Sequence, residues 1–214
     1  MMKHQNSKDL LSYWERLRGN DAAPDRLAVE PRDLAGILPH IFILDVSGPA
    51  AAFRLAGTAI CSAHMGELRG RHMSSLWESE DRNQIETLAR SVSEEGVGAV
   101  IGSKADNGHE TVSFETLLLP LRREGRNEGR LIGTLSPFGK TWSLGSYHMG
   151  PHRLSSLRML TEGRSIPGAL RRAGLTDGGE VHVLDFSKRV RDALPQGRRV
   201  RHLTVIEGGA DALA

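Results

Sequence analysis

The chain carries nine histidines and one cysteine, Cys61, but their spacing matches no common catalytic or metal-binding motif. A single cysteine excludes an internal disulfide framework and a cysteine-rich zinc site. The chain also lacks a Gly-x-Ser-x-Gly elbow, a phosphate-binding Gly-rich Lys loop and a His-Glu-x-x-His pair. The sequence therefore predicts a protein that is not an enzyme, with no catalytic residue and no metal site.

Paired carboxylates give no better case for catalysis. Glu94 and Glu95 are adjacent on a predicted helix, so their side chains point about 100° apart and cannot easily share a proton. They fit a solvated helix end. The phosphoacceptor and ATP-binding motifs of a histidine kinase are absent as well. Any signal would therefore have to pass to a separate protein.

Composition and charge indicate one globular domain with an appendage. The 214 residues are 39% apolar and 25% charged, with a net charge of +2. From Gly150 to Ala214 there are 11 Lys and Arg against 7 Asp and Glu, whereas the first 149 residues have 17 against 19. This asymmetry gives a basic tail, but the molecule as a whole has no strong field that would attract polyanions.

Nothing in the sequence predicts insertion into a membrane. The longest nearly uncharged run, Leu34 to Leu44, is too short to span a bilayer. Residues Met1 to Leu17 mix charged and apolar side chains and so lack the apolar core of a signal peptide. We therefore expect a cytoplasmic protein.

The elements that must position any site form an α+β pattern. An amphipathic helix opens the chain over residues 9–18, and a further helix is predicted over 81–95. Five strand signals are present, at residues 41–46, 53–56, 97–104, 110–121 and 130–138. Short, glycine-punctuated helical pieces lie between the second and third strands. The prediction is one five-stranded antiparallel sheet with inserted short helices.

The fourth strand indicates that both faces of this sheet are covered. Two alternating apolar sets point to opposite faces: Val112, Phe114, Thr116 and Leu118 on one, and Leu117, Leu119 and Leu121 on the other. The inserted helices can cover the first face. The opening helix, from this chain or a second copy, is the natural cover for the second.

From Lys140 onward, glycines and prolines become frequent and aromatics become rare. Leu154, Leu157 and Leu160 predict a short helix, Asp185 to Leu194 a second one, and His202 to Ile206 a strand. The expected organisation is a loose N-terminus at residues 1–7, a domain at 8–139 and an extended, basic, partly flexible tail at 140–214.

This order of elements resembles a PAS domain, a sensory and interaction module of bacterial signalling. Within that class the sequence is similar to a group of alphaproteobacterial regulators in which one PAS domain makes up most of a short protein. The resemblance covers roughly residues 8–139. It rests on these matches: Tyr13-Trp14, Leu17-Arg18-Gly19, Pro24, Arg26, Pro31, Leu38-Pro39-His40-Ile41-Phe42, Leu44-Asp45, Phe53-Arg54-Leu55-Ala56-Gly57-Thr58, Gly66 and Gly70.

The resemblance raises two cofactor alternatives, and no cofactor is predicted. Some PAS domains hold haem through one histidine, for which His64, His72 and His109 are the candidates. Solvent-facing or hydrogen-bonded histidine is the default expectation. Light-sensing PAS domains use a cysteine in a flavin motif, but the residues that flank Cys61 match that motif nowhere.

A small-ligand pocket between the sheet and the inserted helices is the more general alternative, although an ordinary filled core has the same composition. Its expected lining is Leu55, Met65, Trp77, Leu88, Val100, Phe114 and Thr116.

The primary expectation is a regulator that acts by protein–protein interaction, as a homodimer and with histidine kinases or response regulators. It would act in two-component or cell-cycle and developmental signalling. The predicted interaction surface consists of Leu10, Leu11, Trp14 and Leu17 of the opening helix with Leu117, Leu119 and Leu121 of the sheet.

A nucleic-acid-associated regulator is the remaining alternative. Arg171, Arg172 and the run from Arg198 to His202 could neutralise phosphates. No aromatic interleaving and no helix–turn–helix signature accompanies them, so we do not expect nucleic acid as a partner.

Overall fold

The computed structural model describes residues 2–123, 126–139 and 144–160, together with three two-residue strands at 184–185, 199–200 and 203–204. The first half of the chain contains these elements in order: α1 (Gln5–Arg18), η1 (Arg26–Ala28), η2 (Pro31–Leu34), η3 (Leu38–His40), β1 (Ile41–Asp45), β2 (Ala52–Ala56), α2 (Thr58–Ala63), η4 (Met73–Leu76) and α3 (Arg82–Glu95). The second half contains strands: β3 (Gly98–Asp106), β4 (Thr111–Arg123), β5 (Arg126–Pro137), β6 (Arg153–Leu160), β7 (Leu184–Asp185), β8 (Arg199–Val200) and β9 (Leu203–Thr204).

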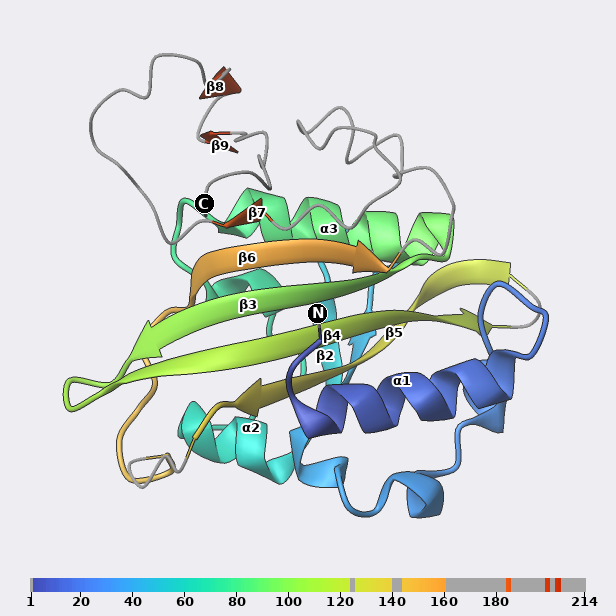
Figure 1. Cartoon of the computed structure of the whole chain (residues 1–214), viewed down its shortest axis with the longest axis horizontal. Coiled ribbons are helices and arrows are strands. Elements are labelled where there is room, and N and C mark those ends of the chain that lie inside the picture. Colours follow the sequence, from blue (N-terminus) through green and yellow to red (C-terminus); the bar gives the residue numbers. More distant parts are fainter. Residues whose placement is uncertain are drawn as a thin grey trace, which may run out of the picture.

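An antiparallel sheet in the order β2-β1-β5-β4-β3-β6-β7 organises the described chain (Figure 1). The predicted α+β architecture, with an N-terminal helix and short helices inserted between the second and third strands, is confirmed. The five expected strands form the order β2-β1-β5-β4-β3. The sheet continues beyond them, because β6 pairs with β3 from Gly98 to Lys104.

The prediction of a helix through Leu154, Leu157 and Leu160 was wrong, because this segment is strand β6. The three-residue spacing of Leu154 and Leu157 fits a helix, but a β-bulge explains it equally well. The register against β3 slips at Gly102/Ser103 and leaves Ser155 without a partner of its own. Leu154 and Leu157 therefore both face the inner core.

Helices cover the two faces of the sheet, and each face has its own core. α2, η4 and α3 pack on the inner face, where Phe42, Trp77, Leu88 and Leu118 are buried in one cluster. α1 crosses the outer face over β4 and β5, in front of the strands in Figure 1. Both faces of β4 are covered, as the alternation of its apolar residues predicts.

Local chemistry explains why α1 begins and ends where it does. The Nδ1 atom of His4 accepts a hydrogen bond from Asn6 N at 3.1 Å and caps the first turn. The helix stops at Gly19, whose φ of 53° is readily adopted only by glycine. Between these ends Leu10 and Trp14 are buried, and Trp14 Nε1 donates to Pro120 O at 2.7 Å. This hydrogen bond fixes where α1 lies along the sheet.

Candidate functional site: a core cavity with His152 and the sheet face under α1

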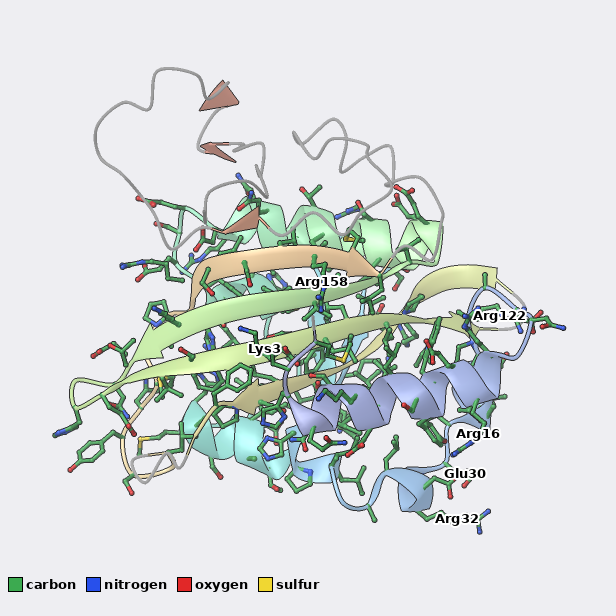
Figure 2. All side chains as sticks on the ribbon, in the orientation of Figure 1. Lys3, Arg16, Glu30, Arg32, Arg122 and Arg158 are labelled. Carbon is green, nitrogen blue, oxygen red and sulfur yellow. The ribbon has the colours of Figure 1, made fainter. Side chains whose placement is uncertain are left out.

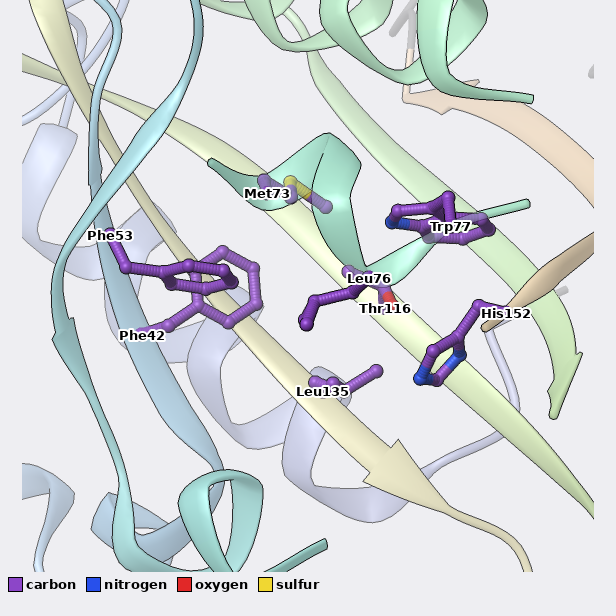
Figure 3. A pocket seen from close by; sticks show the side chains of 8 residues that line it. All are labelled: Phe42, Phe53, Met73, Leu76, Trp77, Thr116, Leu135 and His152. Atoms are coloured by element: carbon purple, nitrogen blue, oxygen red, sulfur yellow. The ribbon is translucent and has the colours of Figure 1, made fainter. Parts of the chain in front are cut away.

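The inner core contains a cavity of about 10 Å³ between the sheet and η4 (Figure 3). The Phe42 and Phe53 rings close one end, and Trp77 and His152 close the other. The complete lining is Phe42, Phe53, Met73, Leu76, Trp77, Thr116, Leu135 and His152. This volume has room for roughly one water molecule. Ligand pockets measure about 300–1,000 Å³, so this cavity fits neither a haem nor a flavin.

His152 and Thr116 are the two polar side chains in this lining, and each is 1% exposed. His152 Nδ1 lies 3.0 Å from Ser103 Oγ, which fixes the orientation of the ring. Neither His152 Nε2 nor Thr116 Oγ1 has a hydrogen-bond partner among the described residues. The cavity therefore has an apolar lining with two buried polar atoms that could each form one more hydrogen bond.

Burial keeps the histidines in this region neutral. It lowers the pKa of His152 to about 3, with a smaller contribution from nearby His64. Burial also lowers the pKa of His64 to about 4, with like-charge repulsion from His148 and Arg71, whereas a hydrogen bond to the backbone of Met149 acts in the opposite direction. The His64 and His152 rings lie 5.4 Å apart, centroid to centroid. No group of three or more His, Cys, Asp or Glu that could hold a metal occurs among the described residues.

The predicted pocket residues are only partly brought together. Trp77 and Thr116 line the cavity, and Leu88 and Phe114 are buried in the same inner core. Whether these four bind a ligand stays a prediction.

The prediction that Val100, Leu55 and Met65 line this pocket was wrong. Val100 alternates with Ala99 and Ile101 along β3 and so belongs to the outer core. Leu55 is 46% exposed because the register of β2 against β1 shifts at Ile43/Leu44, which turns Leu55 to the outer face with Ile43. Met65 follows α2 and is 58% exposed.

Of the three histidines considered for haem, only His64 is buried, whereas His72 and His109 are exposed. Sequence reasoning missed His152, because the segment around it was assigned to the tail. The alternation of apolar residues after Pro151-His152 could have predicted a strand here, but the bulge interrupts that alternation.

The predicted interaction surface is assembled within this one chain. Leu10 and Trp14 of α1 are buried against Leu117, Leu119 and Leu121, each of which is at most 1% exposed. Leu11 and Leu17 are partly buried at the edge of this cluster. A second copy or a partner protein could reach the leucines of β4 only if α1 moved away. Figure 2 shows that Arg16 lies on the side of α1 that faces away from the strands.

The start of α1 is attached to the sheet by several polar contacts. Glu115 is 4% exposed and accepts hydrogen bonds from the backbone N–H groups of Lys3 and His4, at 2.8 and 2.9 Å. Lys3 lies over the strands beside the start of the helix (Figure 2). Ser7 Oγ lies 3.3 Å from Thr134 Oγ1. The hydroxyl pair contributes about 0.5–1.5 kcal/mol, and each hydrogen bond to the Glu115 carboxylate contributes about 1.5–3 kcal/mol.

Comparison with protein families shows where this fold belongs. The family model of the PAS domain matches residues 2–136. The chain therefore belongs to the PAS domain family, which indicates a signalling or sensory role. A comparison with curated proteins found no match. Within the described part of the chain, no helix is long and apolar enough to cross a membrane. β6 and His152 lie beyond the matched residues.

Proposed function

We propose that this protein is a non-enzymatic, cytoplasmic PAS regulator that acts by protein–protein interaction through the outer face of its sheet. The observation that carries the proposal is the amphipathic helix α1, which covers apolar residues of β4 in its own chain. Such a helix is a two-state element, because it can lie on the sheet or leave it. A partner that binds the uncovered face shifts this equilibrium by its differential affinity for the two states.

The arrangement of contacts along α1 supports this mechanism. Apolar packing around Leu10 and Trp14 holds the middle of the helix, whereas hydrogen bonds of Asn6 and Ser7 to the sheet help to hold its start. Release of the helix would expose Leu117, Leu119 and Leu121 as one apolar strip. The amphipathic helix of a second copy, or of a histidine kinase or response regulator, has the chemistry to cover that strip.

The proposal places the chain with the alphaproteobacterial single-PAS regulators, in two-component or cell-cycle and developmental signalling. The small volume of the inner cavity favours this mode over a haem or small-ligand sensor. The basic residues that supported a nucleic-acid alternative lie outside the residues whose side chains the structure describes.

A disulfide between α1 and β5 tests the proposal. Ser7 Oγ and Thr134 Oγ1 are 3.3 Å apart and both residues are buried, so cysteines at these positions are within bonding reach. The variant is Ser7→Cys with Thr134→Cys in a Cys61→Ser background, which leaves no other thiol. We expect the reduced protein to self-associate with rising concentration, and the oxidised protein, whose helix cannot leave, to stay monomeric in sedimentation experiments.

The control is the Cys61→Ser protein alone, whose sedimentation should not respond to oxidant. If the locked and reduced forms sediment identically over the concentration range, the outer face is not a surface for self-association.

A further inference from the structure

The segment Met149–Leu160, termed the C-terminal strap, lies beyond the residues that match the PAS family yet is built into the domain core. β6 supplies most of it and pairs with β3. Four of its N–H groups also donate to other parts of the domain: Met149 to Ala63 O (2.9 Å), Gly150 to Asp106 O (2.8 Å), His152 to Leu76 O (2.7 Å) and Leu154 to Asp81 Oδ2 (2.8 Å). The strap therefore closes the inner core from one side.

His152 is the strap side chain that reaches the cavity. Its ring lies 4.7 Å from the Phe114 ring and 5.4 Å from the Trp77 ring, centroid to centroid. The one hydrogen bond of the imidazole ring within the described residues is that of Nδ1 with Ser103, and Nε2 has none. A neutral imidazole tolerates this environment, whereas an imidazolium would carry a buried charge with an unsatisfied donor.

The surrounding charges make protonation at this position still less favourable. His64, at the end of α2, lies 5.4 Å from His152 and 6.3 Å from His148, so three histidines meet where the strap contacts the domain. Arg71, ahead of η4, adds positive charge near His64. Two acids that contact the strap interact with other groups of it: Glu78 lies 3.8 Å from Arg153, and Asp81 accepts the Leu154 N–H.

From this arrangement we propose that the C-terminal strap is a proton-controlled latch, in which protonation of His152 and His64 releases the strap from β3 and opens the core cavity. The proposal does not depend on the outer-face interaction, since His152 lines the cavity of the inner core and His64 lies beside it, on the side of the sheet away from α1.

The sign and size of the effect follow from linkage. In the closed state the pKa values of His152 and His64 are about 3 and about 4. In the released state both would approach the ordinary value of about 6.5. The released state therefore binds more protons below pH 6.5, and acid favours it. At pH 5.5 each histidine that regains its ordinary pKa raises the opening equilibrium about 10-fold relative to pH 7.5.

Hydrogen exchange of the full chain, read by mass spectrometry at pH 7.5 and 5.5 and corrected for the chemical exchange rate, tests the latch. We expect protection of peptides from residues 149–160 to fall at least about 10-fold at pH 5.5. Protection of the β4 core should change much less. Equal loss in both regions would mean global acid unfolding and would overturn the proposal, as would unchanged protection of the strap.

A matched set of variants assigns the effect to the histidines. His152→Leu with Ser103→Ala removes the titrating ring and its hydrogen-bond partner together and keeps an apolar side chain beside Trp77. The response of its strap to pH should fall by about 10-fold, the share of one histidine. His72→Gln replaces an exposed histidine and should behave as the wild type does.

If the double variant does not fold, His64→Leu provides a second test. It should reduce the loss of strap protection between pH 7.5 and 5.5 by about 10-fold. The proposal is wrong if the histidine variants keep the wild-type response to pH.

Discussion

At the scale of single residues, two buried threonines on opposite faces of the sheet differ in one respect. Thr134 lies under α1 with its hydroxyl 3.3 Å from Ser7 Oγ, and both residues are 0% exposed. Thr116 faces the inner cavity, and its hydroxyl has no partner among the described residues. A buried hydroxyl without a hydrogen-bond partner destabilises the folded state. Removal of a hydroxyl that has a partner also destabilises it, because the partner is then left buried without a hydrogen bond. Substitution of each threonine therefore tests how much its hydroxyl contributes to the stability of the folded state.

Thr134→Val leaves Ser7 Oγ buried without a partner and should lower the free energy of unfolding by about 1–3 kcal/mol. Thr116→Val removes a hydroxyl that is already unpaired, so stability should stay within about 1 kcal/mol of the wild type or rise. Urea unfolding of both variants under identical conditions makes the comparison. Equal losses would show that the Thr116 hydroxyl has a partner in solution, such as a molecule bound in the cavity.

At the scale of elements, close packing between strands depends on one glycine. β5 runs between β1 and β4, and at Gly133 a Cβ atom would overlap the carbonyl oxygen of Leu117 and the ring of Phe42. Phe42 in turn meets Phe53 edge-to-face, with ring centroids 5.7 Å apart, at one end of the inner cavity. The absence of a side chain at Gly133 is what allows the Phe42 ring to take this position.

Gly133→Ala should therefore lower the free energy of unfolding by about 1–3 kcal/mol, because strand backbone or the Phe42 ring must move. Gly36→Ala is the matched control, since Gly36 is exposed and a methyl group added there would meet no heavy atom within 4 Å. Thermal unfolding followed by circular dichroism compares the two. A Gly133→Ala protein as stable as the control would show that the strands can separate without cost.

At the scale of the whole molecule, the structural domain reaches past the end of the PAS match. Leu154, Leu157 and Met159 of β6 are 3–6% exposed and belong to the inner core. Burial of each such side chain contributes about 1.5–3 kcal/mol, and a typical domain has a total stability of about 5–15 kcal/mol. The C-terminal strap therefore supplies a substantial share of the stability, although it lies in the segment that the sequence assigned to the tail.

Two truncations test this extent. A chain of residues 1–139 should unfold at a clearly lower urea concentration than the full chain and should bind a dye that reports exposed apolar surface. A chain of residues 1–160 should lose much less. If both truncations unfold at the same midpoint, β6 adds nothing to the stability of the domain.

The sequence by itself determined the order of the main elements as far as the fifth strand, and the two faces of the sheet. Alternation in β4 separates Phe114 and Leu118 from Leu117 and Leu119, and this pattern is local, since successive side chains of a strand point to opposite sides. The stripe of Leu10 and Trp14 likewise predicted α1 and its need for an apolar surface. The choice between its own sheet and a second copy was left open, because an amphipathic stripe does not encode which surface covers it.

Only the tertiary structure decided the site. His152 enters the cavity because its backbone pairs with Leu76 and Glu78, while the strand that follows it pairs with β3 through a bulge at Ser155. Neither pairing is visible in local periodicity. The same kind of register shift turns Leu55 out of the core. His64 and His152 are 88 positions apart in the sequence, and only the packing of the strap brings their rings within 5.4 Å. Their burial, and with it the direction of their pKa shifts, is a property of that packing.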